Sequence, residues 1–275
     1  MAVRRGGRAA LLNTGVALLS LAVVAPLAWM VSVSLMAAGE AAQVPAPFLP
    51  AHPALTHYRK LFADYDIGIP LLNSIAVSLL ATLLSLLLMV PAGFAFARLR
   101  FRGRIAGVRL LLALLVVPAQ VTFLPLFLLL KEAGLVNSYA GAIAPWLAGI
   151  FGVLYVRQAA LSVPQDMLDA ARLDGASEWQ VFARVVAPVL RPVIATLALT
   201  TFLGVWNDFL WPLIILSDAR LYTLQVALAA MSLAHAQDAE LMMAGSVVTT
   251  LPVLLLFLLL QRNYIQGVLG GSVKG

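Results

Sequence analysis

The sequence predicts an all-α protein that crosses a membrane six times, and three observations support this prediction. Of the 275 residues, 62% are hydrophobic and 11% are charged, whereas a soluble domain normally carries about a quarter charged residues. The mean hydropathy is +0.98. Long charge-free runs recur along the chain, and basic residues gather between alternate runs. These features are typical of a polytopic membrane protein and exclude a soluble domain.

The charge-free runs locate the spans, because a transmembrane helix needs about 20 mostly apolar residues. The first run follows three arginines, but it is too long for a signal-peptide core and lacks a clean small-residue cleavage site, so we interpret it as a retained helix. Asp208 is the one charge inside the fifth span. The expected spans of this single transmembrane domain (1–275) are about 11–35, 67–97, 108–130, 135–157, 192–217 and 241–262.

The basic residues predict the orientation. With a cytoplasmic N-terminus, fourteen of the 18 Lys and Arg residues fall in cytoplasmic segments and four fall outside, which is a strong positive-inside bias. The net charge of +6 is therefore a topology signal and does not indicate nucleic-acid binding. Both termini, the loop 162–191 and the tail 263–275 are expected in the cytoplasm.

Three other segments connect the spans. Four prolines between Glu40 and Asp66 favour an extended outer connector, a potential docking surface, over a packed domain. The segment Arg98–Arg104 predicts a tight basic turn at the inner face, a topogenic anchor that contacts anionic headgroups. Leu221–Gln237 is uncharged but has 17 residues, and a seventh span would move Arg262 outside, so we predict an interfacial or partly inserted helix there.

The stretch Ser162–Pro192 is the one long polar helical stretch of the chain. Ser162 and Gln165 have the spacing of a capping box, and Ser177 and Gln180 repeat it. Gly175 lies between them and readily adopts the left-handed φ that ends a helix. We therefore expect two short helices that meet at an angle, the second closed by Pro188 and Pro192. Spacing alone leaves an ordinary amphipathic surface hairpin as the alternative.

Small and acidic residues recur at fixed spacing within this stretch: Asp169-Ala170-Ala171, Asp174-Gly175-Ala176, Phe182, Ala187-Pro188 and Pro192. The set resembles the EAA loop of ATP-binding-cassette importer permeases, in which the loop is a coupling helix that sits in a cleft of a separate ATPase. The resemblance implies that Asp169, Ala170, Ala171, Asp174, Gly175, Ala176, Phe182 and Pro188 couple this chain to an ATPase. Asp169 replaces the usual glutamate, which keeps the charge but shortens the reach.

Further motifs extend the resemblance over nearly the whole chain: Asn73-Ser74, Ala97–Arg104, Pro118, Pro125, Trp206–Phe209 and Gly267–Gly275. Together they resemble the MalG-type sugar permeases, with the MetI/MalG-like fold. This resemblance implies a MalF-like second permease subunit, a cytoplasmic ATPase dimer and a periplasmic or lipid-anchored solute-binding protein. It also implies that the tail lies at the ATPase interface through Gly267, Gly270, Gly271 and Lys274.

The segment Gly204–Trp211 is the candidate solute path or gate. Gly204, Asp208 and Trp211 fall at i, i+4 and i+7 on one helix face, with Trp206 and Asn207 close by. We expect them to offer hydroxyl partners beside a ring that stacks on a sugar. Alternatively, the tryptophans are interfacial anchors, and Asp208 with Asn207 caps or cross-links helices at the outer gate.

The sequence also limits the energy source and the chemistry. Each of the three lysines is followed by Leu, Glu or Gly, so there is no Walker A motif and the chain itself is expected to hold no cofactor. There are no cysteines, and His52, His57 and His235 lack metal-ligand spacing, which favours surface or loop histidines. Convergent groups for a membrane hydrolase or transferase are not visible, so we expect no enzyme activity.

The predicted function is the permease subunit of an ATP-driven importer in the inner membrane, working by alternating access. The resemblance implies an oligosaccharide, a disaccharide or glycerol-3-phosphate as solute, with ATP and Mg bound by the partner ATPase. Two alternatives remain, an importer of a non-sugar solute and a gradient-driven carrier. The carrier would use Asp208 as its intramembrane ionisable group, although Asp208 lies about 24 Å from Pro192 at the helical rise, near the end of its span.

Overall fold

The computed structural model describes the backbone of residues 2–234 and 238–270 and the side chains of residues 12–233 and 238–259. Within these ranges the regular structure is entirely helical, as predicted. The chain divides into two compact units. One comprises the residues up to Gly68 with Leu228–Pro252, and the other comprises Ile69–Ala227 with the chain from Val253 onward.

Three uninterrupted helices are long and apolar enough to cross a membrane: Leu12–Ser34 in α1 (Ala2–Ser34), α3 (Gly68–Arg98) and Ala239–Leu259 in α14 (Ala239–Gly270). Three bent helix pairs also pass the test of length and composition, which gives up to six spans within the described residues. The expected first, second and sixth spans coincide with the three uninterrupted helices. The other three expected spans are all interrupted.

The expected third span, 108–130, is not one helix. It consists of α4 (Arg104–Leu114), the 3₁₀ turn η1 (Ala119–Thr122) and α5 (Phe123–Glu132), with a bend of 107°. Pro118 precedes η1 with an extended ψ of 131°. A proline disfavours helical geometry in the residue before it and cannot donate to the helix ladder. The charge-free run was a correct signal of apolarity, but the prediction of one continuous helix was wrong.

The expected fourth span, 135–157, also divides, into α6 (Tyr139–Leu147) and α7 (Ile150–Leu161), at an angle of 42°. Close packing against α3 accompanies the break. A Cβ on Gly149 or Gly152 would lie 2.1 Å from Met89 Sδ, and a Cβ on Gly93 would lie 2.5 Å from Val156 Cβ. Only glycine permits such an approach, which is how small residues bring membrane helices together.

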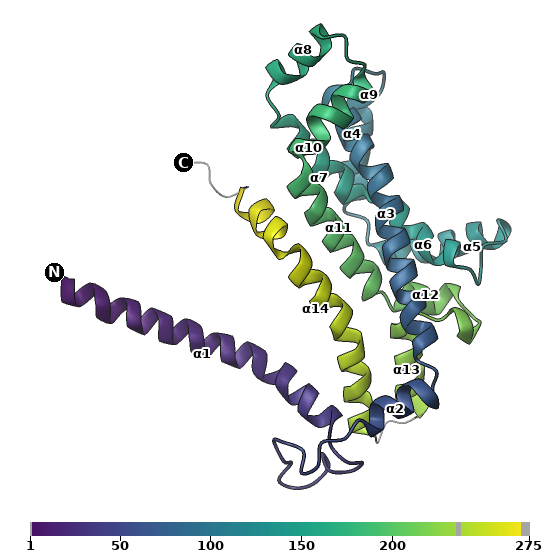
Figure 1. Ribbon diagram of the computed structural model, residues 1–275. Coiled ribbons are helices and arrows are strands. Elements are labelled where there is room, and N and C mark those ends of the chain that lie inside the picture. The colour runs from purple at the N-terminus through teal and green to yellow at the C-terminus, as the bar shows by residue number, and fades with distance from the viewer. Residues whose placement is uncertain (1, 235–237, 271–275) are drawn as a thin grey trace. The chain divides into compact units, whose positions relative to one another are not determined.

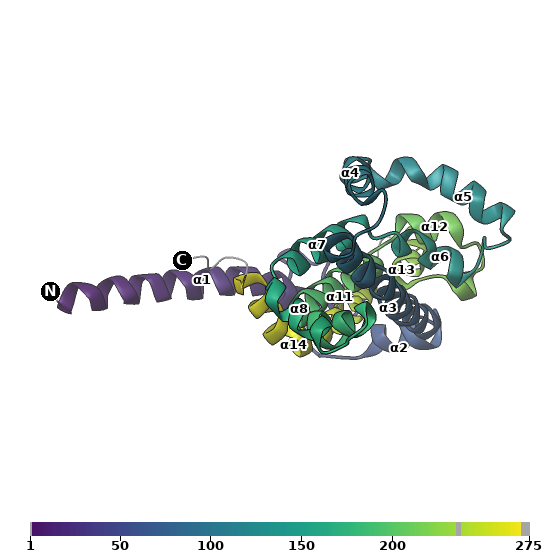
Figure 2. The same cartoon turned by 90° about the horizontal axis from the view of Figure 1, so that it is seen from above.

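The expected fifth span, 192–217, contains α11 (Arg191–Trp206) and α12 (Leu210–Ile215), which are separated at residues 207–209. The third bent pair of span length is instead Glu178–Val189 with α11, at 78°. In Figures 1 and 2, α3, α7 and α11 lie side by side, and α7 packs against α4 and α11 while α6 packs against α12. The two halves of each broken span therefore have different neighbours.

In the first unit, the connector after α1 is more folded than its prolines suggested. It contains α2 (Thr56–Ala63), and the buried carboxylate of Glu40 accepts hydrogen bonds from the N–H groups of Ala51 and Ala37, both at 2.8 Å. The bond from Ala51 and then that from Ala37 hold the pKa of Glu40 below its usual value. An extended connector was therefore the wrong prediction for this segment.

His57 also departs from the prediction. It lies in α2 with 1% of its surface exposed, and its Nε2 lies 3.1 Å from the carbonyl oxygen of Met36, whereas His52 is exposed as expected. His235 lies outside the described residues. No cluster of three or more His, Cys, Asp or Glu residues that could hold a metal ion occurs where the structure is described.

The last two helices, α13 and α14, correspond to the predicted non-spanning segment and the predicted sixth span. α13 (Leu224–Ala234) has 11 residues and a length of about 16 Å, which is too short for a span. This agrees with the prediction that Leu221–Gln237 does not cross, while its place at the interface stays a prediction. α14 continues to Gly270, while its candidate membrane span covers Ala239–Leu259. The expected boundary between span and tail near residue 262 stays a prediction, and the first part of the predicted tail is helical.

Candidate functional site

The loop between α7 and α11 forms two short helices that meet at Gly175, as predicted. α8 (Gln165–Leu173) ends where Gly175 adopts a φ of +83°. Gly175 N–H donates to Arg172 O and Ala176 N–H donates to Ala171 O, both at 3.0 Å. These two bonds form a Schellman motif, which satisfies the last carbonyls of the helix. Glycine is required there because a side chain resists that φ.

Only one of the two predicted capping boxes exists. Ser177 Oγ accepts from the N–H of Gln180 at 3.3 Å, and Gln180 Oε1 accepts from the N–H of Ser177 at 2.8 Å, so α9 (Glu178–Gln180) begins with a complete box. The prediction for Ser162 was wrong. Its hydroxyl donates to Ala159 O at 2.8 Å at the end of α7. Pro164 takes the N-cap position of α8 without a side-chain cap.

Arg98 explains why Gln165 has no capping role. At the end of α3 its Nε donates to Ala160 O at 3.0 Å, and its Nη2 donates to Leu161 O at 3.0 Å and to Val163 O. Its Nη1 donates to Gln165 Oε1 at 2.8 Å. One guanidinium thus satisfies the carbonyls that α7 leaves unpaired at its C-terminus. The sequence indicated Arg98 only as a topology signal and gave no sign of this role.

The second short helix is continuous through Pro188. The π-helix η2 (Val181–Val186) follows α9 and leads into α10 (Ala187–Val189), where Pro188 occupies an N-terminal position. The chain turns only at Leu190, where α11 starts with Pro192 in its first turn. The prediction that Pro188 ends the helix was wrong. Pro188 stands at the first or second position of α10, where the N–H that a proline lacks would have no helical acceptor to lose.

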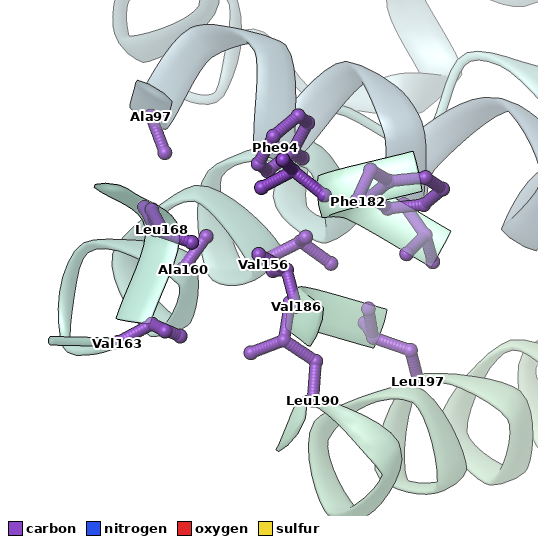
Figure 3. Close-up of a cluster of buried hydrophobic side chains, with 12 residues drawn as sticks. Phe94, Ala97, Val156, Ala160, Val163, Leu168, Phe182, Val186, Leu190 and Leu197 are labelled. Carbon is purple, nitrogen blue, oxygen red and sulfur yellow. The ribbon is translucent and has the colours of Figure 1, made fainter. Parts of the chain in front are cut away.

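A buried apolar cluster fixes this loop to the spanning helices (Figure 3). Leu168 of α8 is fully buried, and Phe182 is 7% exposed with its ring 5.2 Å from that of Phe94 in α3. Val156 and Ala160 of α7 also belong to the cluster. Phe182, expected among the coupling residues, therefore packs inward and connects the loop to α3. The loop and these helices therefore share one buried core.

The outward side of the loop carries the other predicted coupling residues. Asp169, Ala170, Asp174, Gly175 and Pro188 are exposed, and Ala171 and Ala176 are half-buried. Three large apolar side chains accompany them: Leu173, 89% exposed, Trp179, 66% exposed, and Met167, 45% exposed. Apolar side chains exposed this strongly beside a charged surface are typical of an interface with another protein.

Arg172 joins the two short helices electrostatically. Its Nη1 lies 2.9 Å from Asp169 Oδ1, and its Nε lies 2.8 Å from Glu178 Oε1. The bond to Glu178, followed by that to Asp169, raises the pKa of Arg172 above its usual value. Asp169 also accepts from Gln165 Nε2 at 3.0 Å. The carboxylate at the position of the usual glutamate thus has partners within its own chain.

The candidate solute path has a different geometry from the predicted one. The helix ends at Trp206, so Gly204, Asp208 and Trp211 do not share a continuous helical face. Trp211 is fully buried and Trp206 is 1% exposed, with its ring 5.8 Å from Phe202 in a stacked arrangement. The prediction of a shared face with a ring open to a sugar was wrong for this conformation. Asn207 is exposed, and its side chain donates to Leu203 O at 2.9 Å.

Asp208 caps one helix and connects to another. Its Oδ1 accepts from the N–H of Trp211 at 3.3 Å, at the start of α12, and its Oδ2 accepts from Trp146 Nε1 at 3.3 Å. A Cβ on Gly204 would lie 2.7 Å from the Trp146 ring, so the glycine leaves room for it. These contacts match the alternative in which Asp208 caps and cross-links helices. Trp146 had no distinguishing signal in the sequence.

Pro145 accounts for the second connection between α6 and α12. A proline has no N–H, so the carbonyl of Gly141, four residues earlier, lacks its helical donor. Trp211 Nε1 donates to that carbonyl at 3.0 Å. Ser85 Oγ of α3 donates to Trp146 O at 2.7 Å, next to the break at Ala148–Gly149. Side chains from two other helices, α12 and α3, thus satisfy backbone carbonyls of α6 next to its interruption.

Residues 235–237 and 271–275 are not described, so the predicted tail contacts of Gly271 and Lys274 lie outside the described residues. Gly267 and Gly270 belong to the last turns of α14, where only the backbone is described.

Comparison with known proteins shows which family contains this loop and these helix breaks. Residues 89–269 match the family described as binding-protein-dependent transport system inner membrane component. The matched region contains the loop between α7 and α11 and two helix breaks, the one at 148–149 between α6 and α7 and the one at 207–209 between α11 and α12. In the solved crystal structure of a bacterial transporter involved in the import of the acidic polysaccharide alginate, one chain has the same fold, with a TM-score of 0.80 and 23% identity over 94% of this chain and 96% of that one.

Curated relatives carry transport names. The arabinooligosaccharides permease protein AraQ of Halalkalibacterium halodurans is 37% identical, over 74% of this chain and 73% of the relative. The lactose permease protein LacG of Rhizobium radiobacter is 36% identical, over 78% of each chain. The diacetylchitobiose uptake permease protein NgcG of Streptomyces coelicolor is 33% identical, over 93% of this chain and 85% of the relative.

Proposed function

We propose that this chain imports a sugar or a sugar-like solute. The premise is that it belongs to the family of binding-protein-dependent transport system inner membrane components and is a permease subunit of an ATP-binding-cassette importer. The support for the solute class is that curated relatives named for arabinooligosaccharides, lactose and diacetylchitobiose are 33 to 37% identical to this chain. An oligosaccharide, a disaccharide or glycerol-3-phosphate fits this class.

The observation that carries the coupling assignment is the loop between α7 and α11. The exposed side chains of the loop combine apolar Leu173, Met167 and Trp179 with acidic Asp169 and Asp174. The buried Leu168 and Phe182 fix the loop to α3 and α7. A partner that presses on such a loop moves the spanning helices with it. We therefore assign this outward side to a cytoplasmic ATPase dimer, which binds ATP and Mg and hydrolyses the ATP.

The remaining partners follow from the family. The second permease subunit is MalF-like, and a periplasmic or lipid-anchored protein delivers the solute. With both termini in the cytoplasm, as the positive-inside bias favours, the breaks at 148–149 and 207–209 belong to the fourth and fifth of six spans. Discontinuous spans are where transporters change between inward-facing and outward-facing states. The connections from Trp146 to Asp208 and from Trp211 to Gly141 support our assignment of this role to α6 and α12.

Affinity purification in a mild detergent, followed by mass spectrometry, tests the assembly. We expect an ATPase with a Walker A motif and a second permease chain to co-purify with the tagged subunit. Purification of this chain only with copies of itself contradicts the heteromer. Purification without an ATPase contradicts the coupling assignment. A panel of radiolabelled sugars and non-sugar osmolytes, offered to vesicles containing the purified complex and its binding protein, then identifies the solute class.

Asp208 separates ATP-driven from gradient-driven transport. A carrier that uses its carboxylate as the proton site loses concentrative uptake in Asp208→Asn, because the amide cannot ionise. In an ATP-driven importer the same change leaves one acceptor oxygen for two donors, Trp146 Nε1 and the N–H of Trp211. The loss of one charge-assisted hydrogen bond costs about 1.5 to 3 kcal/mol, and uptake falls but persists. We expect uptake into vesicles at constant ATP to resist a protonophore. Collapse of wild-type uptake under the protonophore would overturn the ATP-driven assignment.

A further inference from the structure

The turn between α3 and α4 carries a charged hollow that the transport function does not explain. The turn is tight because Gly103 adopts a φ of +85° at the start of α4. A hollow of about 330 Å³ opens beside it, lined by Arg100, Phe101, Gly103, Arg104, Ile105 and Ala106. At about 30 Å³ for each water molecule, this volume exceeds what a phosphate group needs.

The two guanidinium groups at the hollow have no anionic partner among the side chains that the structure describes. Among the described side chains, no ion pair involves Arg100 or Arg104. Arg104 uses one nitrogen, Nη1, to donate to Leu99 O at 3.1 Å, which leaves its other donors open. No acidic residue occurs between Arg98 and Arg109. By contrast, neighbouring Arg98 is engaged by three carbonyls and Gln165.

The position of the hollow identifies the kind of anion. α3 is a 31-residue apolar helix that ends at Arg98, so the turn lies where a span meets the headgroup layer. Along α4, exposed apolar side chains begin immediately at the hollow: Ile105 is 67% exposed, Leu110 60% and Leu112 52%. Phe101, at the rim, is 44% exposed. A ligand held there by its phosphate can therefore lay an acyl chain along α4.

We propose that Arg100 and Arg104, in the hollow at the α3–α4 turn, bind the phosphate of an anionic phospholipid whose acyl chain lies against α4. Arginine suits this role because its planar fork donates two parallel hydrogen bonds to phosphate oxygens. The site rests on the placement of α3 as a membrane span and is independent of the identity of the transported solute. Free inorganic phosphate shares the headgroup chemistry but lacks the chain that α4 would hold.

Native mass spectrometry of the complex, purified in a mild detergent with phosphatidylglycerol or phosphatidylcholine added, tests the proposal. We expect at least one phosphatidylglycerol to be retained in preference to phosphatidylcholine. Arg100→Gln with Arg104→Gln should reduce that preference about tenfold or more, given the contribution of each basic side chain near an anionic surface. The control, Arg102→Gln with Arg109→Gln, removes the same charge from the same segment, but neither residue lines the hollow, and it should retain the lipid.

Two further arms complete the test. Arg100→Gln alone leaves the bond from Arg104 to Leu99 intact and should give an intermediate loss of lipid preference. This single variant therefore tests the site even if the double variant folds poorly. Millimolar inorganic phosphate should not displace the lipid; displacement would assign the site to free phosphate. Equal lipid retention by the wild type and the hollow variant, or equal losses in the hollow and control variants, would overturn the proposal. ATPase co-purification, measured on the same samples, reports separately on the transport assignment.

Discussion

The loop between α7 and α11 and the two helix breaks are organised by interactions of different range. In the loop, the defining contacts join residues close in sequence: Ser177 with Gln180, Arg172 with Glu178, and the turn at Gly175. At the breaks, Trp146 bonds Asp208 across 62 residues and Trp211 bonds Gly141 across 70. The turn at Gly175 and the cap at Ser177 are thus specified by the sequence of the loop, and the breaks by partners on other spans.

The largest effect is expected where a long-range contact is also a packing contact. Trp211→Ala removes a fully buried ring and leaves Gly141 O unpaired beside Pro145, at a cost of about 3 to 5 kcal/mol of stability. Trp211→Phe keeps most of the volume and should cost about 1 to 3 kcal/mol for the unpaired carbonyl. Thermal unfolding of the detergent-purified protein measures both.

The matched control is Trp179→Ala, because Trp179 is 66% exposed in the loop. It should change the unfolding temperature little while weakening ATPase co-purification. Equal destabilisation by Trp211→Ala and Trp179→Ala would remove the distinction between a break held by distant contacts and a loop held by local ones.

Arg98 is a long-range contact that stabilises the start of the loop. It lies in α3 and donates to backbone carbonyls at the end of α7. Arg98→Lys preserves the charge that sets topology but cannot donate to several carbonyls at fixed angles. We expect a loss of about 1.5 to 3 kcal/mol and weaker coupling of ATP hydrolysis to solute. Arg109→Lys, on the exposed side of α4, is the control and should match the wild type. If both variants unfold alike, the bonds from Arg98 do not stabilise the loop.

This contrast explains what could be predicted from the sequence. Apolar runs gave α1, α3 and most of α14 correctly because a span depends on composition over some twenty residues. The Schellman turn and the Ser177 box follow rules that act over three to six residues. The breaks at 148–149 and 207–209 could not be located, because both depend on residues distant in the sequence. Gly149 is required by the close approach of Met89, and Asp208 is satisfied by donors from Trp146 and from the start of α12.

Ser162 shows the limit of the local rules. Its spacing to Gln165 is identical to that of Ser177 to Gln180, but Arg98 from α3 binds Gln165 Oε1 and α7 extends to Leu161. A distant arginine thus overrides the local motif. The same holds for the 107° bend of the third expected span, where Pro118 indicated a kink but not its size.

Gly175 tests the loop by itself, because its φ of +83° is set locally and a Cβ there would meet no atom within 4 Å. Gly175→Val should cost about 1 to 3 kcal/mol from backbone strain, misdirect α9 and reduce ATPase co-purification without preventing membrane insertion. Gly175→Asn is the matched variant, since asparagine adopts the left-handed region more readily than other side chains, and should restore much of the binding. Normal uptake and normal ATPase binding by Gly175→Val would contradict the coupling role of the loop.

The smallest effect is expected from replacing Ser177 or Ser162, which have the same spacing to a glutamine. Ser177→Ala removes a capping bond that the structure contains and should cost about 1 kcal/mol. Ser162→Ala removes only a hydroxyl bonded to Ala159 O on an exposed turn, and such surface changes usually stay within about 0.5 kcal/mol. Thermal unfolding of both variants, with Gln180→Ala to remove the reciprocal half of the box, measures the difference. Because the two serines have the same spacing to glutamine, equal effects would mean that the local motif, rather than the fold around it, determines the stability of the loop.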